Sequence, residues 1–195
     1  AATPLVGSAG PHHGEEDVLV GRGGSGTIFF AGCNLGCRFC QNWSLSHMLD
    51  GTATSVEDLA GAMTALAARG CENINLVTPT HFADSVARAV ELARSTGLEV
   101  PIVYNCGGYE SLKVLKCLEG LVDIYMPDFK TLDPDFAERA LLAPDYPKRV
   151  RSALKEMQRQ VGDLEIDERG VARRGLLVRH LVMPGQTGDA GGGLG

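Results

Sequence analysis

Short apolar runs and longer segments of helical periodicity alternate along this chain of 195 residues. Continuous apolar runs, typical of buried strands, occupy residues 27–31, 73–77, 100–104, 122–126 and 176–183. Between them, apolar residues recur every three or four positions and predict helices near residues 54–69, 83–95, 111–118 and 150–161. Because strands that alternate with helices form parallel βαβ units, the pattern favours an α/β fold.

Local signals mark the ends of several elements. Thr54 and Glu57 form a capping-box pair at the start of the first helix. A glycine follows each predicted helix, at positions 70, 97, 120 and 162. Residues 164–167, with the basic turn after them, predict a small hairpin.

The first 24 residues are rich in Gly and Pro, and we expect them to be irregular. They include four potential metal ligands: His12, His13, Glu15 and Glu16. Such a polar group before a strand is more often a solvated loop. Residues 21–26 match GxGxxG, but they precede a strand instead of following one, which excludes a dinucleotide-binding fingerprint.

Polar segments follow the carboxyl ends of four predicted strands, at residues 33–40, 78–81, 105–108 and 128–130. In a parallel barrel those strand ends share one face, which is the face that carries active sites. The pattern therefore assembles one candidate site from four segments. Five predicted strands are too few to close an eight-stranded barrel.

Composition narrows the classes of function. The formal net charge of -6 and the lack of a basic stripe argue against a nucleic-acid surface. No apolar run approaches the length of a membrane span, and no signal-peptide pattern opens the chain. The length suits one domain with one core.

Six cysteines are present, and three of them cluster at positions 33, 37 and 40. The others are scattered, so a disulfide framework is not indicated and a reducing cytoplasm fits best. Three clustered thiolates select soft metals, and they would leave one iron of a four-iron cluster open. His47 offers a fourth ligand for a closed zinc site of the Cys3His type. Spacing alone leaves a cluster, a structural zinc site and plain buried thiols as alternatives.

The segment CNLGCRFC, residues 33–40, resembles the CxxxCxΦC signature of the radical S-adenosylmethionine (SAM) superfamily, with Phe39 as the aromatic residue. The resemblance implies that Cys33, Cys37 and Cys40 bind a [4Fe-4S] cluster whose fourth iron is chelated by SAM. It also implies reductive cleavage of SAM to a radical that abstracts hydrogen. Phe39 would then pack near the adenine, unless it is an ordinary core aromatic.

Within that superfamily, the chain is most similar to homologues of pyruvate formate-lyase activating enzymes, the branch called PflX. The matching stretches are GSGTIFFAGCNLGCRFCQN, NINLVTPTHF, PIVYN with GYES, DIYMPDFK and VRHLVMPG. The resemblance implies a partial (β/α)6 barrel, of which this chain, as a fragment, would hold about five strands. The core domain would span residues 25–185, and residues 186–195 would form a Gly-rich tail or truncated end.

The resemblance also suggests SAM contacts. Thr78 and Thr80 stand where many relatives carry Gly-Gly-Glu; the carboxylate is missing here, so backbone carbonyls and a hydroxyl would hold the SAM amino group. The remaining matches are a polar residue, an Asp-x-Lys pair and a strand arginine that would clamp the SAM carboxylate: Asn105, Asp128 with Lys130, and Arg179. For each, a solvated or structural role is the alternative.

The sequence thus predicts a radical SAM oxidoreductase, with activation of a glycyl radical enzyme as a narrower possibility. The expected partners are a protein or small-molecule substrate and an electron donor of the flavodoxin or ferredoxin type, with no nucleic acid and no membrane. The alternative is a zinc-binding structural or interaction module built on the three cysteines.

Overall fold

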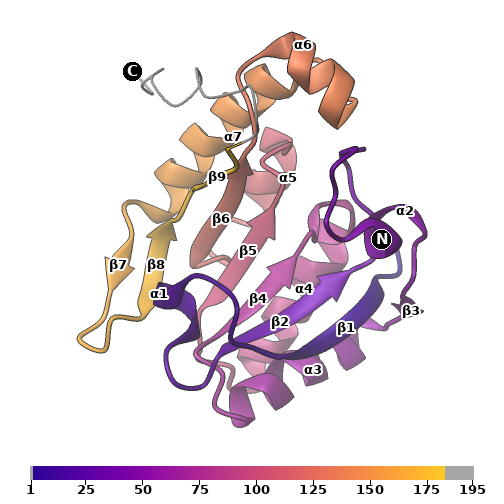
Figure 1. Cartoon of the computed structure of the whole chain (residues 1–195). Helices are drawn as coiled ribbons and strands as arrows, with labels where there is room; N and C mark the ends of the chain where they lie inside the picture. Colours follow the sequence, from indigo (N-terminus) through magenta and orange to yellow (C-terminus); the bar gives the residue numbers. More distant parts are fainter. Residues whose placement is uncertain (1, 183–195) are drawn as a thin grey trace.

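Residues 2–182, the part of the chain that this computed structural model describes, are organised around one sheet (Figure 1). Its strands are β1 (Leu5–His12), β2 (Ser25–Phe30), β3 (Thr52–Ala53), β4 (Asn73–Val77), β5 (Ile102–Cys106), β6 (Ile124–Phe129), β7 (Glu165–Ile166), β8 (Ala172–Leu176) and β9 (Arg179–His180). The strand order is β3-β1-β2-β4-β5-β6-β8-β7, and β9 pairs with β6. Strands β2, β4, β5, β6 and β8 are parallel neighbours, which confirms the predicted α/β class.

Helices cover the sheet mainly on one face. The helical elements are α1 (Asp17–Val20), α2 (Trp43–His47), α3 (Val56–Ala68), η1 (Thr80–Phe82), α4 (Ala83–Ser95), α5 (Leu112–Cys117), α6 (Pro134–Phe136), η2 (Ala137–Leu141) and α7 (Tyr146–Val161). Figure 1 shows α3, α4, α5 and α7 behind the sheet and α1 in front of it. Within residues 2–182, no helix combines the length and apolar character that crossing a membrane requires.

Alternation along the strands gives the sheet two different faces. Ile74 and Leu76 of β4 pack with α3 and α4 in the main core on the outer, helix-covered face. Asn73 and Asn75 therefore point to the opposite, inner face. On that face, Leu19 of α1 packs on the sheet in an apolar cluster with Val103, Ile124, Met126 and Ala172.

The N-terminal segment is more regular than its composition indicates. We expected residues 1–24 to be irregular, which is wrong for residues 5–12 and 17–20 because they form β1 and α1. β1 is antiparallel to β2, with Gly10 opposite Thr27 and Pro11 opposite Gly26. Backbone pairing with a buried neighbour supplies the stability that the Gly- and Pro-containing segment lacks locally.

The last predicted strand is divided in two. β8 begins earlier than expected because it forms the predicted hairpin with β7, residue 174 opposite residue 165. β8 pairs with Ile124 and Tyr125 of β6, whereas β9 pairs with Asp128 and Phe129 of the same strand. Residue 183 and the expected tail at 186–195 lie outside the described residues.

The predicted capping box at the start of α3 is displaced by one residue. The N-cap is Ser55, whose hydroxyl oxygen accepts a hydrogen bond of 3.0 Å from the Asp58 backbone N–H. Thr54 instead donates its hydroxyl to the Thr52 carbonyl. The Ser55 hydroxyl also donates to the Asp58 carboxylate. Ser55 and Asp58 therefore bind each other through two hydrogen bonds, and this pair caps the helix.

We expect Ser55→Ala to lower the free energy of unfolding by about 1 kcal/mol, because it leaves an N-terminal amide of α3 without its acceptor. Thr54→Ala, one residue earlier, is the matched control and should change it by less than about 0.5 kcal/mol. Urea titration of both variants measures the difference. A larger loss in Thr54→Ala would place the cap at the position that the sequence pattern first indicates.

Candidate functional site

The three clustered cysteines lie on a loop that leaves the carboxyl end of β2. The loop is fixed to η2 by two backbone hydrogen bonds, from Gly36 N to Leu141 O at 3.1 Å and from Arg38 N to Ala140 O at 2.9 Å. The turn into the loop requires glycine at position 32, where φ is +88° and a Cβ would lie 2.9 Å from His81 Nε2. His81 Nε2 also contacts the Ala31 carbonyl at 2.7 Å, so His81 supports this turn.

All three thiols are free, and they are held in a poorly solvated environment. Cys37 is buried, and Cys33 and Cys40 are half-buried. Burial raises the pKa of Cys33 and raises that of Cys37 to about 11, whereas the Lys130 ammonium lowers both. The Cys37 thiol is therefore protonated at neutral pH in this state, and metal binding would release its proton.

The three sulfur ligands of this loop are of the kind that binds an iron–sulfur cluster. Three soft sulfur ligands on one short loop match the ligand chemistry of such clusters. Within residues 2–182, however, no group of three or more His, Cys, Asp or Glu side chains is arranged to hold a metal ion. The case for a cluster therefore rests on the chemistry of the three ligands.

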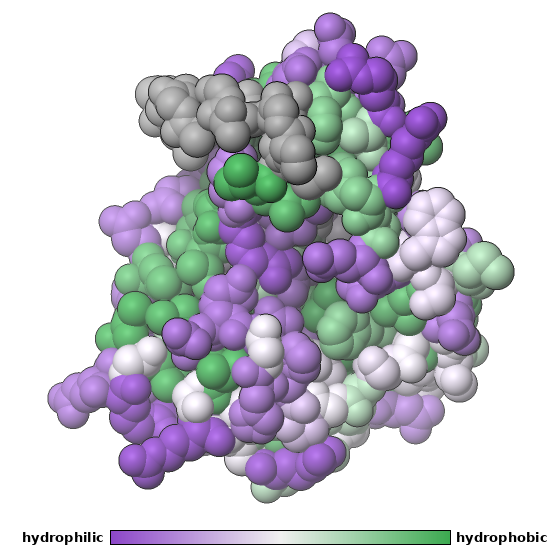
Figure 2. All heavy atoms as spheres, in the orientation of Figure 1, coloured by the Kyte–Doolittle hydropathy of each residue, from purple (hydrophilic) through white to green (hydrophobic). Residues whose placement is uncertain are grey.

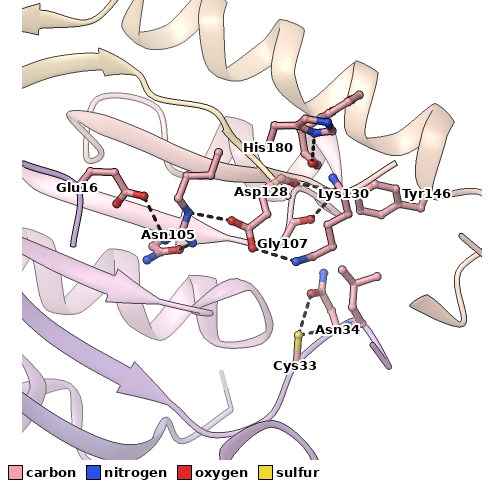
Figure 3. A network of polar contacts seen from close by, with 12 residues as sticks. Glu16, Cys33, Asn34, Asn105, Gly107, Asp128, Lys130, Tyr146 and His180 are labelled. Atoms are coloured by element: carbon pink, nitrogen blue, oxygen red, sulfur yellow. Dashed lines mark hydrogen bonds and ion pairs between the residues drawn. The ribbon is translucent and has the colours of Figure 1, made fainter. Parts of the chain in front are cut away.

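A network of charged and polar side chains lies beside the loop and is centred on Asp128, at the end of β6 (Figure 3). One carboxylate oxygen of Asp128 accepts from Lys130 Nζ at 2.9 Å. The other accepts from Arg179 Nε at 2.8 Å. Arg179 Nη2 also donates to Asn105 Oδ1 at 2.8 Å, so four predicted site residues from three strands and one loop are brought together.

Tyr146, at the start of α7, fixes the backbone of this network. Its buried hydroxyl has one hydrogen, which is shared between the Asp128 carbonyl at 2.8 Å and the Gly107 carbonyl at 3.0 Å. It accepts from the Lys130 backbone N–H at 3.0 Å. No local sequence signal identifies Tyr146, because its partners lie 16 to 39 residues away.

Lys130 connects the network with the cysteine loop. Figure 3 shows its side chain reaching from Asp128 toward Asn34 and Cys33. Asn34 in turn donates its side-chain amide to the Tyr109 carbonyl at 2.5 Å. The loop, the end of β5 and the end of β6 therefore form one continuous edge, as the strand-end pattern predicts.

The two threonines after β4 have different environments. Thr78 has a φ of +59°, which is rare for a β-branched residue, and its backbone N–H donates to the Asn105 carbonyl at 2.8 Å. The Thr80 hydroxyl donates to Glu110 Oε1 at 2.7 Å. Thr78 thus adjoins the network through its backbone, whereas the Thr80 side chain is bound elsewhere.

Glu110 is a buried carboxylate that the sequence analysis did not single out. Besides Thr80, the Tyr104 hydroxyl donates to it at 3.3 Å, and the Cys106 thiol also contacts it. Burial raises the Glu110 pKa above its ordinary value of 4.5, although these hydrogen bonds lower it. Tyr104 and Cys106 pack in the core under α5 and α7, so Glu110 supports the site from the outer face.

Phe39 and His47 do not extend the network. Phe39 stacks on Phe136 with ring centroids 6.4 Å apart and packs in the cluster beneath the loop. His47 stacks on Trp43 at 3.7 Å, and its Nδ1 lies 2.7 Å from the Ser46 hydroxyl. The His47 ring is therefore engaged by its own helix α2, which does not favour it as the fourth ligand of a zinc site.

Tyr146→Phe should lower the free energy of unfolding by about 1–3 kcal/mol, because it leaves the Lys130 N–H and two carbonyls without their buried partner. Tyr109→Phe is the matched control, since its hydroxyl binds the exposed Asp145 and should contribute less than about 1 kcal/mol. Chemical denaturation compares the two. Equal losses would mean that the Tyr146 hydroxyl does not hold this edge together.

The raised pKa of Glu110 predicts a pH dependence of stability. A carboxyl whose folded-state pKa lies above its unfolded value favours folding while it is protonated and loses that contribution as the pH rises. Glu110→Gln cannot ionise, so its stability relative to the natural protein should increase as the pH is raised from about 4.5 toward neutrality. Thermal unfolding of both proteins across this range tests the slope, and a constant difference would contradict it.

Comparison with known proteins identifies a relative and a family. A protein of Methanocaldococcus jannaschii, "Uncharacterized protein MJ0674", is 30% identical over 182 residues, which are 89% of this chain and 48% of the relative. The chain thus spans about half the length of that relative. The family model described as "Radical SAM superfamily" matches residues 27–190, which include the cysteine loop and the strands around it. This match covers most of the chain, so the protein belongs to the radical SAM superfamily.

Proposed function

We propose that the protein is a radical SAM enzyme in which Cys33, Cys37 and Cys40 hold a [4Fe-4S] cluster. The observation that carries this proposal is the loop of three free thiols at the carboxyl edge of a parallel sheet, in a chain of this superfamily. Three thiolates would leave one iron for SAM. When bound, the cluster and SAM would supply one-electron chemistry, which cleaves SAM reductively and removes hydrogen from a substrate.

The protein's own charges suit that role. Lys130 is close enough to lower the pKa of Cys33 and Cys37, and its cation would offset part of the negative charge of a thiolate-bound cluster. Asp128 holds Lys130 in place by a contact of 2.9 Å. Tyr146 holds the Asp128 backbone, so the cation is positioned before any ligand binds.

We infer the SAM contacts from this edge. Its polar rim is formed by four side chains: Asn105, Asp128, Lys130 and Arg179. Thr78 contributes backbone groups, and Thr80 lies beside them. Phe39 packs under the loop. Arg179 already uses Nε and Nη2 for Asp128 and Asn105, and Glu15 and Glu16 lie 3.7 and 3.8 Å from its Nη1. A bidentate grip on the SAM carboxylate would therefore compete with carboxylates already placed around the guanidinium. Its role as a clamp stays a prediction.

The narrower assignment is an enzyme like the PflX branch of pyruvate formate-lyase activating enzyme homologues. Its support is the set of matching stretches along the chain, from GSGTIFFAGCNLGCRFCQN to VRHLVMPG. A glycyl radical enzyme as substrate, a flavodoxin or ferredoxin as electron donor and a cytoplasmic location are parts of the same proposal. The zinc-binding alternative is not favoured, given the family and the engagement of His47.

Cys40→Ser should abolish both iron–sulfur absorbance and formation of deoxyadenosine from SAM, because it removes one of three cluster ligands while keeping nearly the same shape. Cys117→Ser, which changes an exposed cysteine away from the loop, is the matched control and should leave both intact. The measurements use anaerobically purified, reconstituted and reduced protein.

The reduced natural protein should also give a four-iron electron paramagnetic resonance signal that changes when SAM is added. Stoichiometric zinc with neither iron nor sulfide, or deoxyadenosine formation that survives Cys40→Ser, would contradict the proposal.

A further inference from the structure

The inner face of the sheet carries a buried amide that the proposed cluster site does not use. Asn75, in the middle of β4, is fully buried, and neither its side-chain oxygen nor its side-chain nitrogen has a hydrogen-bond partner within residues 2–182. Its neighbours Ile74 and Leu76 point into the helix-covered core, so the Asn75 side chain faces the inside of the partial barrel.

Asn73, the neighbouring asparagine on the same face, has a structural role. Asn73 accepts from the Ser25 hydroxyl at 2.6 Å and donates to the Leu19 carbonyl of α1 at 2.7 Å. Both of its polar atoms are thus satisfied by the fold. A buried amide that lacks such partners destabilises the folded state, so the Asn75 amide is available to a partner other than the protein itself.

A second unpartnered atom lies at the edge of the same face. Glu16 directly precedes α1, the helix that Asn73 anchors to β4, and its Oε2 is buried without a hydrogen-bond partner in the described part of the chain. Its other oxygen is 3.8 Å from Arg179 Nη1, and Glu15 Oε2 is 3.7 Å from the same nitrogen. In Figure 3 the contact drawn from Glu16 runs to the Arg179 guanidinium, which also binds Asn105. Asn105 lies opposite Val77 of β4, two residues after Asn75.

The surroundings are polar and recessed. Figure 2, which views this side of the molecule, shows hydrophilic residues gathered in the hollowed centre between more apolar flanks. Three carboxylates, those of Glu15, Glu16 and Asp128, face two cations, Arg179 and Lys130. Burial is the main cause that raises the pKa of Glu15, and the neighbouring Glu16 carboxylate raises it further, whereas Arg179 lowers it.

The chemistry of the unused atoms defines a complementary ligand. Glu16 Oε2 and Asn75 Oδ1 accept hydrogen bonds, and Asn75 Nδ2 donates one. A ligand that satisfies them has a cationic donor and at least one oxygen acceptor close to it. A primary ammonium next to a carbonyl or hydroxyl group meets both conditions and also offsets the excess of carboxylates.

We propose that the inner face between α1 and β4 binds a small molecule that carries a primary ammonium group beside a hydrogen-bond acceptor, through Glu16 and Asn75. Its identification as the substrate of the radical reaction rests on the proposed function, whereas the binding site itself does not. The ammonium is bound by Glu16 and the Asn75 oxygen, and the acceptor by the Asn75 amide.

Binding can be tested on the full, metal-free chain with three small probes. Glycinamide has both the ammonium and the acceptor, acetamide lacks the ammonium, and ethylamine lacks the acceptor. Saturation-transfer NMR should detect glycinamide most strongly. No glycinamide signal above that of acetamide would overturn the proposal.

Two substitutions assign the site. Glu16→Gln should weaken glycinamide binding by at least about 10-fold, because it removes a charge-assisted hydrogen bond. Asn75→Leu should abolish binding and raise the unfolding temperature by roughly 3 °C, because it replaces an unpaired buried amide with an apolar group of similar size. Glu91→Gln, on the exposed side of α4, is the control and should change neither.

The outcomes are distinct. Binding that survives both Glu16→Gln and Asn75→Leu overturns the site, as does a loss of stability in Asn75→Leu with binding intact. Displacement of glycinamide by SAM would mean that the site binds the amino group of SAM. That result would overturn the proposal of a ligand other than SAM. Separate assay of SAM cleavage on the reconstituted protein shows whether the enzyme proposal fails while this site stands.

Discussion

The bridging carboxylate of Asp128 is the interaction on which the candidate site depends. One side chain at the end of β6 binds a cation that reaches toward the cysteine loop and another that spans to β5. Its backbone carbonyl is fixed separately by Tyr146. Without this carboxylate, Lys130 and Arg179 would be two partly buried like charges in the same region, which repel each other at low local dielectric.

The two faces of the sheet have different roles: the outer face packs the hydrophobic core, and the inner face carries the polar side chains of the candidate site. The outer face buries apolar side chains against α3, α4, α5 and α7 and supplies the hydrophobic stabilisation. The inner face is apolar where α1 packs on β5, β6 and β8, and it is polar along β4 and at the carboxyl ends of β5 and β6. That arrangement places ionisable groups where a ligand is accessible, at the cost of desolvating them.

The periodic pattern predicted the fold where local and tertiary preferences agree. Residues 73–77 and 83–95 form β4 and α4 with the expected limits, because an apolar strand run and a glycine stop specify them locally. The segment of β1 was missed because its stability comes from pairing with β2 and not from its own composition. The four-segment site was predictable because parallel strands share one edge, whereas Tyr146 and Glu110 act through contacts with distant segments that no local motif encodes.

The left-handed backbone of Thr78 has a consequence for how ready this edge is to bind. A glycine in that position would sample mirror-image conformations freely and would lose that freedom on binding. A threonine held at a φ of +59° by the Asn105 carbonyl stores steric strain in the turn, but it restricts the directions in which the peptide groups after β4 can point. If a ligand binds at this turn, most of the entropy cost of ordering the turn has already been met during folding, so little of the binding free energy would be spent on it.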